Sequence, residues 1–258
     1  MGKAKEYSGA LLPPLRALYF LAALLLLVVL WEAAASLYQR PYLPHVWEIG
    51  ERLWRELSAG ELVGDLQLSL RRIALSLLIS SLTGITFGLL AARSSYGSRL
   101  LRPIILATYP MPHITLIPIL LWLLGVEGSK IAVISLITFY PIALSTMEWA
   151  LRTPREYEQL IETMGGNAWH KTVYVVIPSI LPGVLTGLRL AVSTAFAVVF
   201  VAESFVLTGG VGAFIEESWQ RFDYAGVYAG MIALSAAGMI SYAAIWLLEK
   251  RYREKIGY

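Results

Sequence analysis

The sequence predicts an all-α membrane protein with about six transmembrane helices. Hydrophobic residues make up 57% of the 258 residues and charged residues only 15%, whereas soluble domains carry roughly 25% charged residues. The mean hydropathy is correspondingly high, at +0.63. The apolar residues also gather in runs of about 20, which is the length that a helix needs to cross a bilayer.

Six segments have this length and apolar character, and we expect each to cross the membrane. The second has no charged residue, whereas the fifth contains Arg189 and Glu203. The third contains Pro110, Pro112 and Pro118. Because proline removes a backbone donor and opens a helix, we expect this segment to be interrupted, with carbonyl groups exposed to a cavity. The six segments are residues 17–36, 73–92, 104–126, 131–150, 181–206 and 228–248.

These segments divide the chain into three parts. Residues 1–37 contain an N-terminal tail and the first helix, residues 38–71 form an external polar stretch, and residues 72–258 form the membrane core. Within the polar stretch, residues 46–57 carry apolar side chains at helical spacing, which predicts an amphipathic helix on the membrane surface. We favour a packing role for this helix over a sensor or binding role. Its apolar positions are Val46, Ile49, Leu53 and Leu57.

The lysine and arginine residues predict the orientation, because cytoplasmic loops are enriched in them. With the N-terminus inside, the inner segments hold thirteen of these residues and the outer segments seven. The contrast is sharpest in the C-terminal tail. An even number of helices then places both termini, together with residues 152–177, in the cytoplasm.

Several classes of function are disfavoured by missing residues. The chain has no cysteine, which excludes disulfides, thiolate metal sites and a cysteine nucleophile. His45, His113 and His170 lie far apart without carboxylates at metal-ligand spacing, and no nucleophile elbow or phosphate-binding loop occurs. We therefore expect no catalytic residue, no metal and no cofactor bound by this chain. The net charge of +3, without a basic cluster, argues against nucleic acid.

The longest inner loop, at about residues 155–178, has a helical pattern of its own. Leu160, Ile161 and Met164 fall on one helical face, while the glutamates and Gln159 stay polar. A glycine pair at 165–166 ends this helix. A loop of this length and pattern is not typical of a passive connector.

A second short helix is predicted after the glycine pair. Asn167 can cap its first turn, and Trp169 begins an apolar stripe that ends at Pro178. The loop is therefore expected to be a helix, a glycine turn and a second helix on the cytoplasmic side.

This loop resembles the EAA loop of binding-protein-dependent ABC importer permeases. Gly165 matches the loop glycine, Trp169 a commonly aromatic position and residues 177–178 the terminal hydrophobe and proline. The three positions of the EAA triplet fall on residues 159–161, so Gln159 stands where the family usually has glutamate. Glutamates at 158 and 162 flank the triplet.

Similar matches extend from near Tyr42 to the C-terminus. The ordered set is most similar to the branch of these permeases that carries nitrate, sulfonates, taurine and bicarbonate. The matching segments are residues 69–72, 112 with 118, 121–125, 129–130, 187–189, 202–203, 210–212 and 248–251.

The resemblance implies a type I ABC importer transmembrane fold in the cell membrane. It also implies several partners: two cytoplasmic ATPases that bind and hydrolyse ATP, an extracytoplasmic solute-binding protein and a second permease copy, with a homodimer favoured. The loop would bind the ATPases. The implied coupling residues are Glu158, Gln159, Leu160, Glu162, Met164, Gly165, Trp169 and Pro178.

Five residues within the membrane segments are candidates for the translocation path, since ionisable groups inside a membrane are often functional. Tyr109, His113 and Thr115 lie beside the prolines of the third segment, with packing against a neighbouring helix as the alternative. Arg189 either reaches toward the cytoplasm as a structural residue or contacts an anionic substrate. Glu203 is either an outer gate or docking contact, or a solvated helix end.

The leading hypothesis is a permease subunit that carries a small anion such as nitrate, a sulfonate, taurine or bicarbonate. An importer of a vitamin or vitamin precursor, such as a thiamine pyrimidine or riboflavin, is the alternative. An ion-coupled secondary transporter would need paired broken helices in two related halves, and only the third segment has the prolines of a broken helix. A membrane enzyme would need a catalytic constellation that the sequence lacks.

Overall fold

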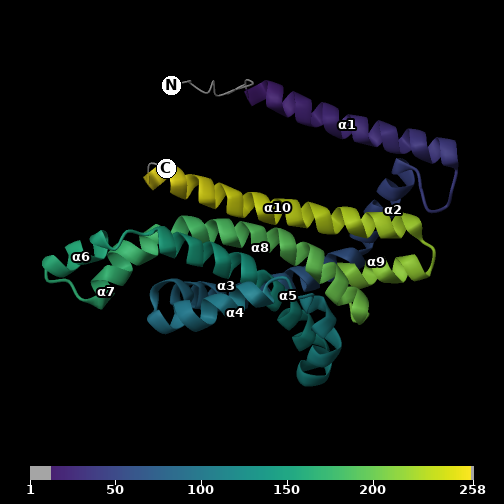
Figure 1. The fold of residues 1–258 in the computed structure, drawn as a ribbon. Helices are drawn as coiled ribbons and strands as arrows, with labels where there is room; N and C mark the ends of the chain where they lie inside the picture. Colours follow the sequence, from purple (N-terminus) through teal and green to yellow (C-terminus); the bar gives the residue numbers. More distant parts are fainter. Residues whose placement is uncertain (1–12, 257–258) are drawn as a thin grey trace.

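The structure, a computed structural model, describes residues 13–256; residues 1–12, which hold the predicted N-terminal tail, and residues 257–258 lie outside the described residues. The described residues fold into helices and short connections, without a strand (Figure 1). The helices are α1 (Pro13–Tyr38), α2 (Val46–Ala59), α3 (Glu61–Arg93), η1 (Gly97–Leu101), α4 (Arg102–Thr108), η2 (His113–Leu116), α5 (Ile117–Arg152), α6 (Glu156–Thr163), α7 (Ala168–Lys171), η3 (Thr172–Val176), α8 (Ile177–Phe205), α9 (Val211–Gln220) and α10 (Tyr224–Ile256).

Five of these helices, α1, α3, α5, α8 and α10, are long and apolar enough to cross a membrane. The continuous third helix that the sequence predicts at residues 104–126 is not observed. Instead, α4 ends at Thr108, residues 109–112 form a non-helical turn, and α5 begins only at Ile117 after the short 3-10 helix η2. Gly125, with φ of +69°, interrupts the helix again. Pro110 and Pro112 explain the first break, because each lacks the donor that a continuous helix needs, whereas Pro118 sits in the first turn of α5, where that donor is not required.

The broken segment nevertheless runs along the bundle from one end toward the other. Gly97 packs against Leu90 near the end of α3, and Glu127 forms an ion pair with Arg72 at 2.5 Å. Leu90 and Arg72 are 18 residues apart on α3, which corresponds to about 27 Å along a helix. Residues 97–127 therefore make an irregular crossing beside α3.

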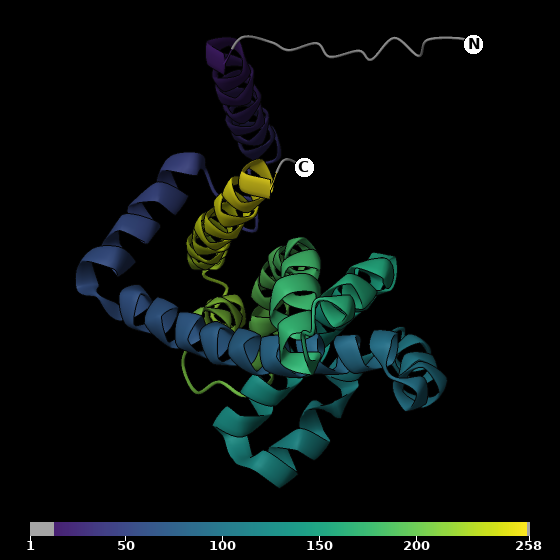
Figure 2. The same cartoon turned by 90° about the vertical axis from the view of Figure 1, so that its left-hand side faces the viewer.

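The two ends of the bundle carry different short helices (Figure 1). Helices α6 and α7 protrude at one end, where the first described turn of α1 and the last turn of α10 also lie. Helices α2 and α9 lie at the opposite end. Figure 2, viewed from the α6–α7 end, shows α2 running across the bundle rather than along it.

The amphipathic helix predicted at 46–57 is confirmed as α2. Ile49 is buried and Leu53 partly buried, whereas Trp47 and Trp54 are exposed. Its first turn is capped by Glu48, whose carboxylate accepts a hydrogen bond from the His45 backbone N–H at 2.8 Å. The helix therefore packs with its apolar face inward, at the end of the bundle opposite to α6 and α7.

The second membrane helix is longer than predicted, because α3 begins at Glu61 rather than near residue 73. The sequence predicts that the residues of this first part, up to 71, belong to the external polar stretch. In the structure they are helical, and Arg72, which follows them, is only 1% exposed because it is paired with carboxylates from two other helices. Charge alone was a poor guide to the start of the helix because paired charges can lie inside the bundle.

Small residues allow the central helices to pack closely. A side chain at Gly88 would lie 2.6 Å from the Ala143 carbonyl oxygen of α5, and one at Gly187 of α8 would lie 2.8 Å from that of Pro141. Gly84 of α3 faces Ile142 of α5 in the same way. Helices α3, α5 and α8 thus form the core that positions the rest of the chain.

A buried ion pair joins two of these central helices. Arg72 of α3 and Glu203 of α8 are 1% and 0% exposed, and their side chains are 2.7 Å apart. Glu203 also accepts hydrogen bonds from the Ser69 hydroxyl at 2.9 Å and the Gly212 N–H at 2.8 Å. The interpretation of Glu203 as a solvated helix end is therefore wrong, because its side chain is fully buried and bonded to Arg72, Ser69 and Gly212.

The same cluster fastens the loop between α8 and α9. Arg72 donates to the Gly209 carbonyl oxygen at 2.8 Å, and the Gly210 N–H donates to Asp65 at 2.7 Å. Lys130 of α5 donates to the Thr208 hydroxyl, also at 2.7 Å. This end of the bundle is held together by polar contacts that reach three membrane helices.

We expect Arg72→Leu to lower the free energy of unfolding by about 3 kcal/mol or more, because it leaves Glu203 buried without its cation. The double variant Arg72→Leu, Glu203→Leu should recover most of this loss, since two apolar side chains replace the pair. Denaturant titration in mixed micelles measures both values. A double variant no more stable than Arg72→Leu would contradict the assignment of the loss to an unpaired charge.

Candidate coupling surface and translocation path

The predicted helix–glycine–helix loop is present at the α6–α7 end of the bundle. Helix α6 ends at Thr163, and Gly165 adopts a φ of +79°, a conformation that favours glycine. Asn167 then caps α7, because its side-chain oxygen accepts a hydrogen bond from the His170 N–H at 3.2 Å. The local sequence signals therefore predicted this loop correctly.

The loop presents large apolar side chains that this chain leaves uncovered. Leu160 is 57% exposed, Met164 76% and Trp169 70%, and Tyr157 is exposed beside them. Ile161 is only partly exposed, and together with Leu160 and Tyr157 it lines a cavity against Trp149 and Pro178 of the adjoining helices. Exposed apolar side chains grouped in this way are typical of a surface that binds another protein.

Two of the three acidic residues of α6 form ion pairs within the chain. Glu158 forms an ion pair with Arg93 at the end of α3, and Glu162 forms one with Lys171 of α7. Gln159, at the position where the family usually has glutamate, is exposed. The ion pair that anchors α6 to the membrane core thus comes from the residue before the triplet.

The candidate path residues do not lie together: Tyr109 and His113 share one cluster, whereas Thr115, Arg189 and Glu203 each lie apart from it. His113 Nε2 lies 2.8 Å from the Tyr140 hydroxyl oxygen, and the Tyr109 ring centroid lies 5.5 Å from that of Tyr140. Thr115 is not part of this group by hydrogen bonding, since its hydroxyl donates to the Pro112 carbonyl oxygen in its own turn. The break in the third crossing therefore carries a cluster of three aromatic rings.

Arg189 and Glu203 lie apart from each other on α8. They are 14 residues apart, which corresponds to about 21 Å along the helix. Arg189 is paired with Glu249 of α10 at 2.9 Å and donates to the Tyr242 hydroxyl at 3.0 Å. The structure thus gives both residues partners within the chain and does not bring them together.

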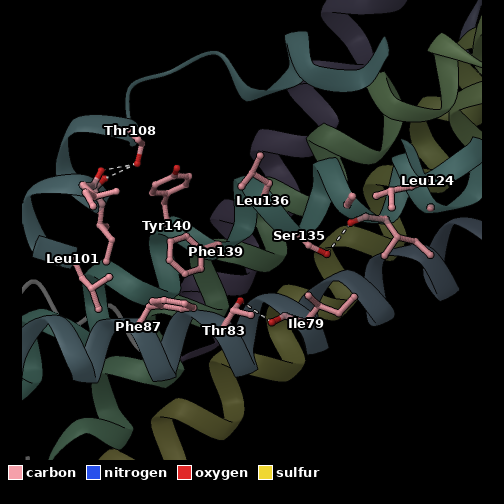
Figure 3. Close-up of a pocket in the computed structure, with 15 residues that line it drawn as sticks. Ile79, Thr83, Phe87, Leu101, Thr108, Leu124, Ser135, Leu136, Phe139 and Tyr140 are labelled. Carbon is pink, nitrogen blue, oxygen red and sulfur yellow. Dashed lines mark hydrogen bonds between the residues drawn. The ribbon is translucent and has the colours of Figure 1, made fainter. Parts of the chain in front are cut away.

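A cavity of about 660 Å³ adjoins the aromatic cluster (Figure 3). Phe87 and Thr83 of α3 line one side, and Tyr140 and Phe139 of α5 line another, with Leu101 beside them. None of its lining residues is charged. A cavity of this size and character is within the range of small-molecule sites.

Sequence reasoning missed Tyr140, Glu127 and the pairing of Arg72. Tyr140 lies in an apolar helix, where a single tyrosine is more often a packing residue. Arg72 and Glu203 did carry a usable signal, because two opposite charges in two membrane helices indicate a partner for each. Only the fold shows which charges meet.

The comparisons with known proteins agree with this arrangement. A family model described as the binding-protein-dependent transport system inner membrane component matches residues 84–254. The formylaminopyrimidine transport permease protein ThiX of Halalkalibacterium halodurans is 36% identical over 227 residues, which cover 87% of this chain and 90% of that protein. The riboflavin transport system permease protein RibX of Chloroflexus aurantiacus is 31% identical, and the match covers 88% of this chain and 86% of that protein. The putative aliphatic sulfonates transport permease protein SsuC of Bacillus subtilis is 30% identical, and the match covers 75% of this chain and 70% of that protein.

Solved structures show the fold. A chain of the inward-facing MetNI methionine ABC transporter matches with a TM-score of 0.59 at 19% identity, over 77% of this chain and 98% of that chain. A chain of an amino acid ABC transporter matches with a TM-score of 0.60 at 13% identity, and the match covers 79% of this chain and 97% of that chain. The fold is thus that of a type I ABC importer transmembrane domain. From the family model, the curated relatives and the membrane bundle together, this chain belongs to the binding-protein-dependent transport inner membrane components and is the permease subunit of an ABC importer in the cell membrane.

Proposed function

We propose that two copies of this chain form the path of an importer for a small heteroaromatic vitamin precursor. A binding protein delivers the solute, and two ATPase subunits, which bind and hydrolyse the ATP, dock on α6 and α7. Docking at this loop is supported by the exposed apolar side chains that it presents, those of Leu160, Met164 and Trp169. Both chain termini then lie in the cytoplasm with the loop, as the lysine and arginine distribution favours.

A second copy is needed to cover the break in the third crossing. Tyr109 and Met111 are 55% and 56% exposed in a single chain, and the backbone around them is not helical. Non-helical backbone at membrane depth is tolerated only where protein buries it or where it lines a water-filled cavity. Contact with lipid would leave it unsatisfied, so we infer that this face lies at the interface of a homodimer.

The substrate class is supported by the relatives and by the charges. Two relatives that are 36% and 31% identical are named for transport of formylaminopyrimidine and riboflavin, both of which contain heteroaromatic rings. The basic side chains within the bundle have partners in the chain: Arg72 and Arg189 pair with carboxylates, and Lys130 donates to Thr208. The charges of Arg72 and Arg189 are thus matched by carboxylates, while Lys130, bonded to a neutral hydroxyl, is only 2% exposed. A sulfonate is the second candidate, because the relative SsuC is named for the transport of aliphatic sulfonates and the relative TauC for that of taurine, which is itself a sulfonate.

We expect Leu160→Asp to reduce coupled uptake about tenfold or more, because a charge placed in an apolar docking surface removes a central contact. The measurement is solute uptake and solute-stimulated ATP hydrolysis by the complete importer in proteoliposomes. Gln159→Glu is the matched control, since it adds the same charge one residue away at a position where the family usually has glutamate. Unchanged stimulated hydrolysis in Leu160→Asp would refute the coupling role.

We expect Met111→Cys to form a disulfide-linked dimer on mild oxidation of the importer, because the proposed interface brings two copies of this segment together. The chain has no cysteine of its own, so the introduced thiol is the only one in the permease. Leu25→Cys is the control: Leu25 is 67% exposed on the regular helix α1, a surface suited to lipid. Non-reducing electrophoresis gives the result, and equal cross-linking of both variants would count against the interface.

A further inference from the structure

The break in the third crossing combines exposure with a group of polar aromatic side chains. It lies between Gly97, beside the inner part of α3, and Glu127, which is paired near its outer part. Residues 109–113 are therefore close to the middle of the crossing. Because this face cannot meet lipid, the side chains that it carries face either the second copy or the path between the copies.

The three rings of this group lie side by side. The centroid of Tyr140 is 4.8 Å from that of His113 and 5.5 Å from that of Tyr109, with tilted planes in both pairs. Tyr140 is only 5% exposed, whereas Tyr109 is 55% exposed. Tyr140 thus supports the group from within the bundle, and the Tyr109 ring offers a free face on which another ring can stack.

His113 adds hydrogen-bonding capacity to this aromatic surface. Its Nε2 is hydrogen-bonded to the Tyr140 hydroxyl at 2.8 Å, and within residues 13–256 its Nδ1 has no partner in the chain. The bond to Tyr140 orients the ring, and the tautomer that it selects decides whether Nδ1 donates or accepts. A ring nitrogen or an amide of a ligand can satisfy this position.

The neighbouring cavity extends the surface into the bundle. It has a volume of about 660 Å³, is lined by Tyr140 and contains no charged residue. The hydroxyls of Thr83, Thr108 and Ser135 in its lining are bonded to carbonyl groups of their own helices. An anion there would meet an apolar lining that supplies no compensating charge, whereas a neutral planar ring needs none.

From this geometry we propose that Tyr109, His113 and Tyr140 form a contact site for the heteroaromatic ring of the transported solute. Tyr109 stacks on the ring, His113 hydrogen-bonds to it, and the Tyr140 hydroxyl holds His113 in position. This assignment rests on the proposed function, because it requires that the broken crossing line the path and that the solute carry such a ring.

The test uses the complete importer in proteoliposomes with radiolabelled formylaminopyrimidine as the probe. Tyr140→Phe, which removes only the hydroxyl, and His113→Ala should each raise the KM for uptake about fivefold to tenfold, as expected for the loss of one hydrogen bond. ATP hydrolysis stimulated by the loaded binding protein should stay within about twofold of the unmodified importer, because the coupling surface is intact. Tyr38→Phe, at the far end of α1, is the matched control and should leave KM unchanged.

The outcomes separate this site from the proposed function. Unchanged KM in both Tyr140→Phe and His113→Ala, with Leu160→Asp still abolishing uptake, would overturn the site and leave the importer assignment intact. Uptake of taurine but not of the pyrimidine by the unmodified importer would overturn the substrate class and the site with it. Coupled uptake that survives Leu160→Asp would count against the docking assignment whatever the KM of the Tyr140 variant.

Discussion

The pairing of Arg72 with Glu203 is the interaction on which the outer part of the bundle depends. A bilayer offers no water to an unpaired charge, so a charged side chain can remain between helices only where the protein supplies every partner. Here the further partners come from α3, from the loop after α8 and from α9, through Ser69, Gly209 and Gly212. One buried pair therefore fixes the relative positions of two membrane helices and a connection.

The same requirement explains the third crossing. A proline-broken segment has backbone groups that its own helix cannot satisfy. In the single chain Tyr109 and Met111 remain exposed. The non-helical backbone at these residues is compatible with a membrane only when protein or a water-filled cavity lies against it. This requirement is the basis for our proposal that the break faces the path or a second subunit; His113 lies at the break, and the buried Tyr140 of α5 bonds to it from within the bundle.

The loop of α6 and α7 has charged and apolar side chains in different surroundings. The ion pair between Glu158 and Arg93 holds α6 against the end of α3, a central membrane helix. Leu160 and Met164 are left exposed. The carboxylate that reaches Arg93 belongs to Glu158, the residue before Gln159.

The sequence by itself determined the membrane class, the amphipathic α2 and the helix–Gly165–helix loop, because these depend on hydropathy, on periodicity and on capping residues that act within a few positions. Tertiary structure alone decided that α3 begins at Glu61, that Glu203 is buried and that His113 meets Tyr140. These features depend on contacts between residues 27 to 131 positions apart. A charge or a tyrosine in one helix does not reveal which distant helix supplies its partner, and that partner determines whether it can stay inside the membrane.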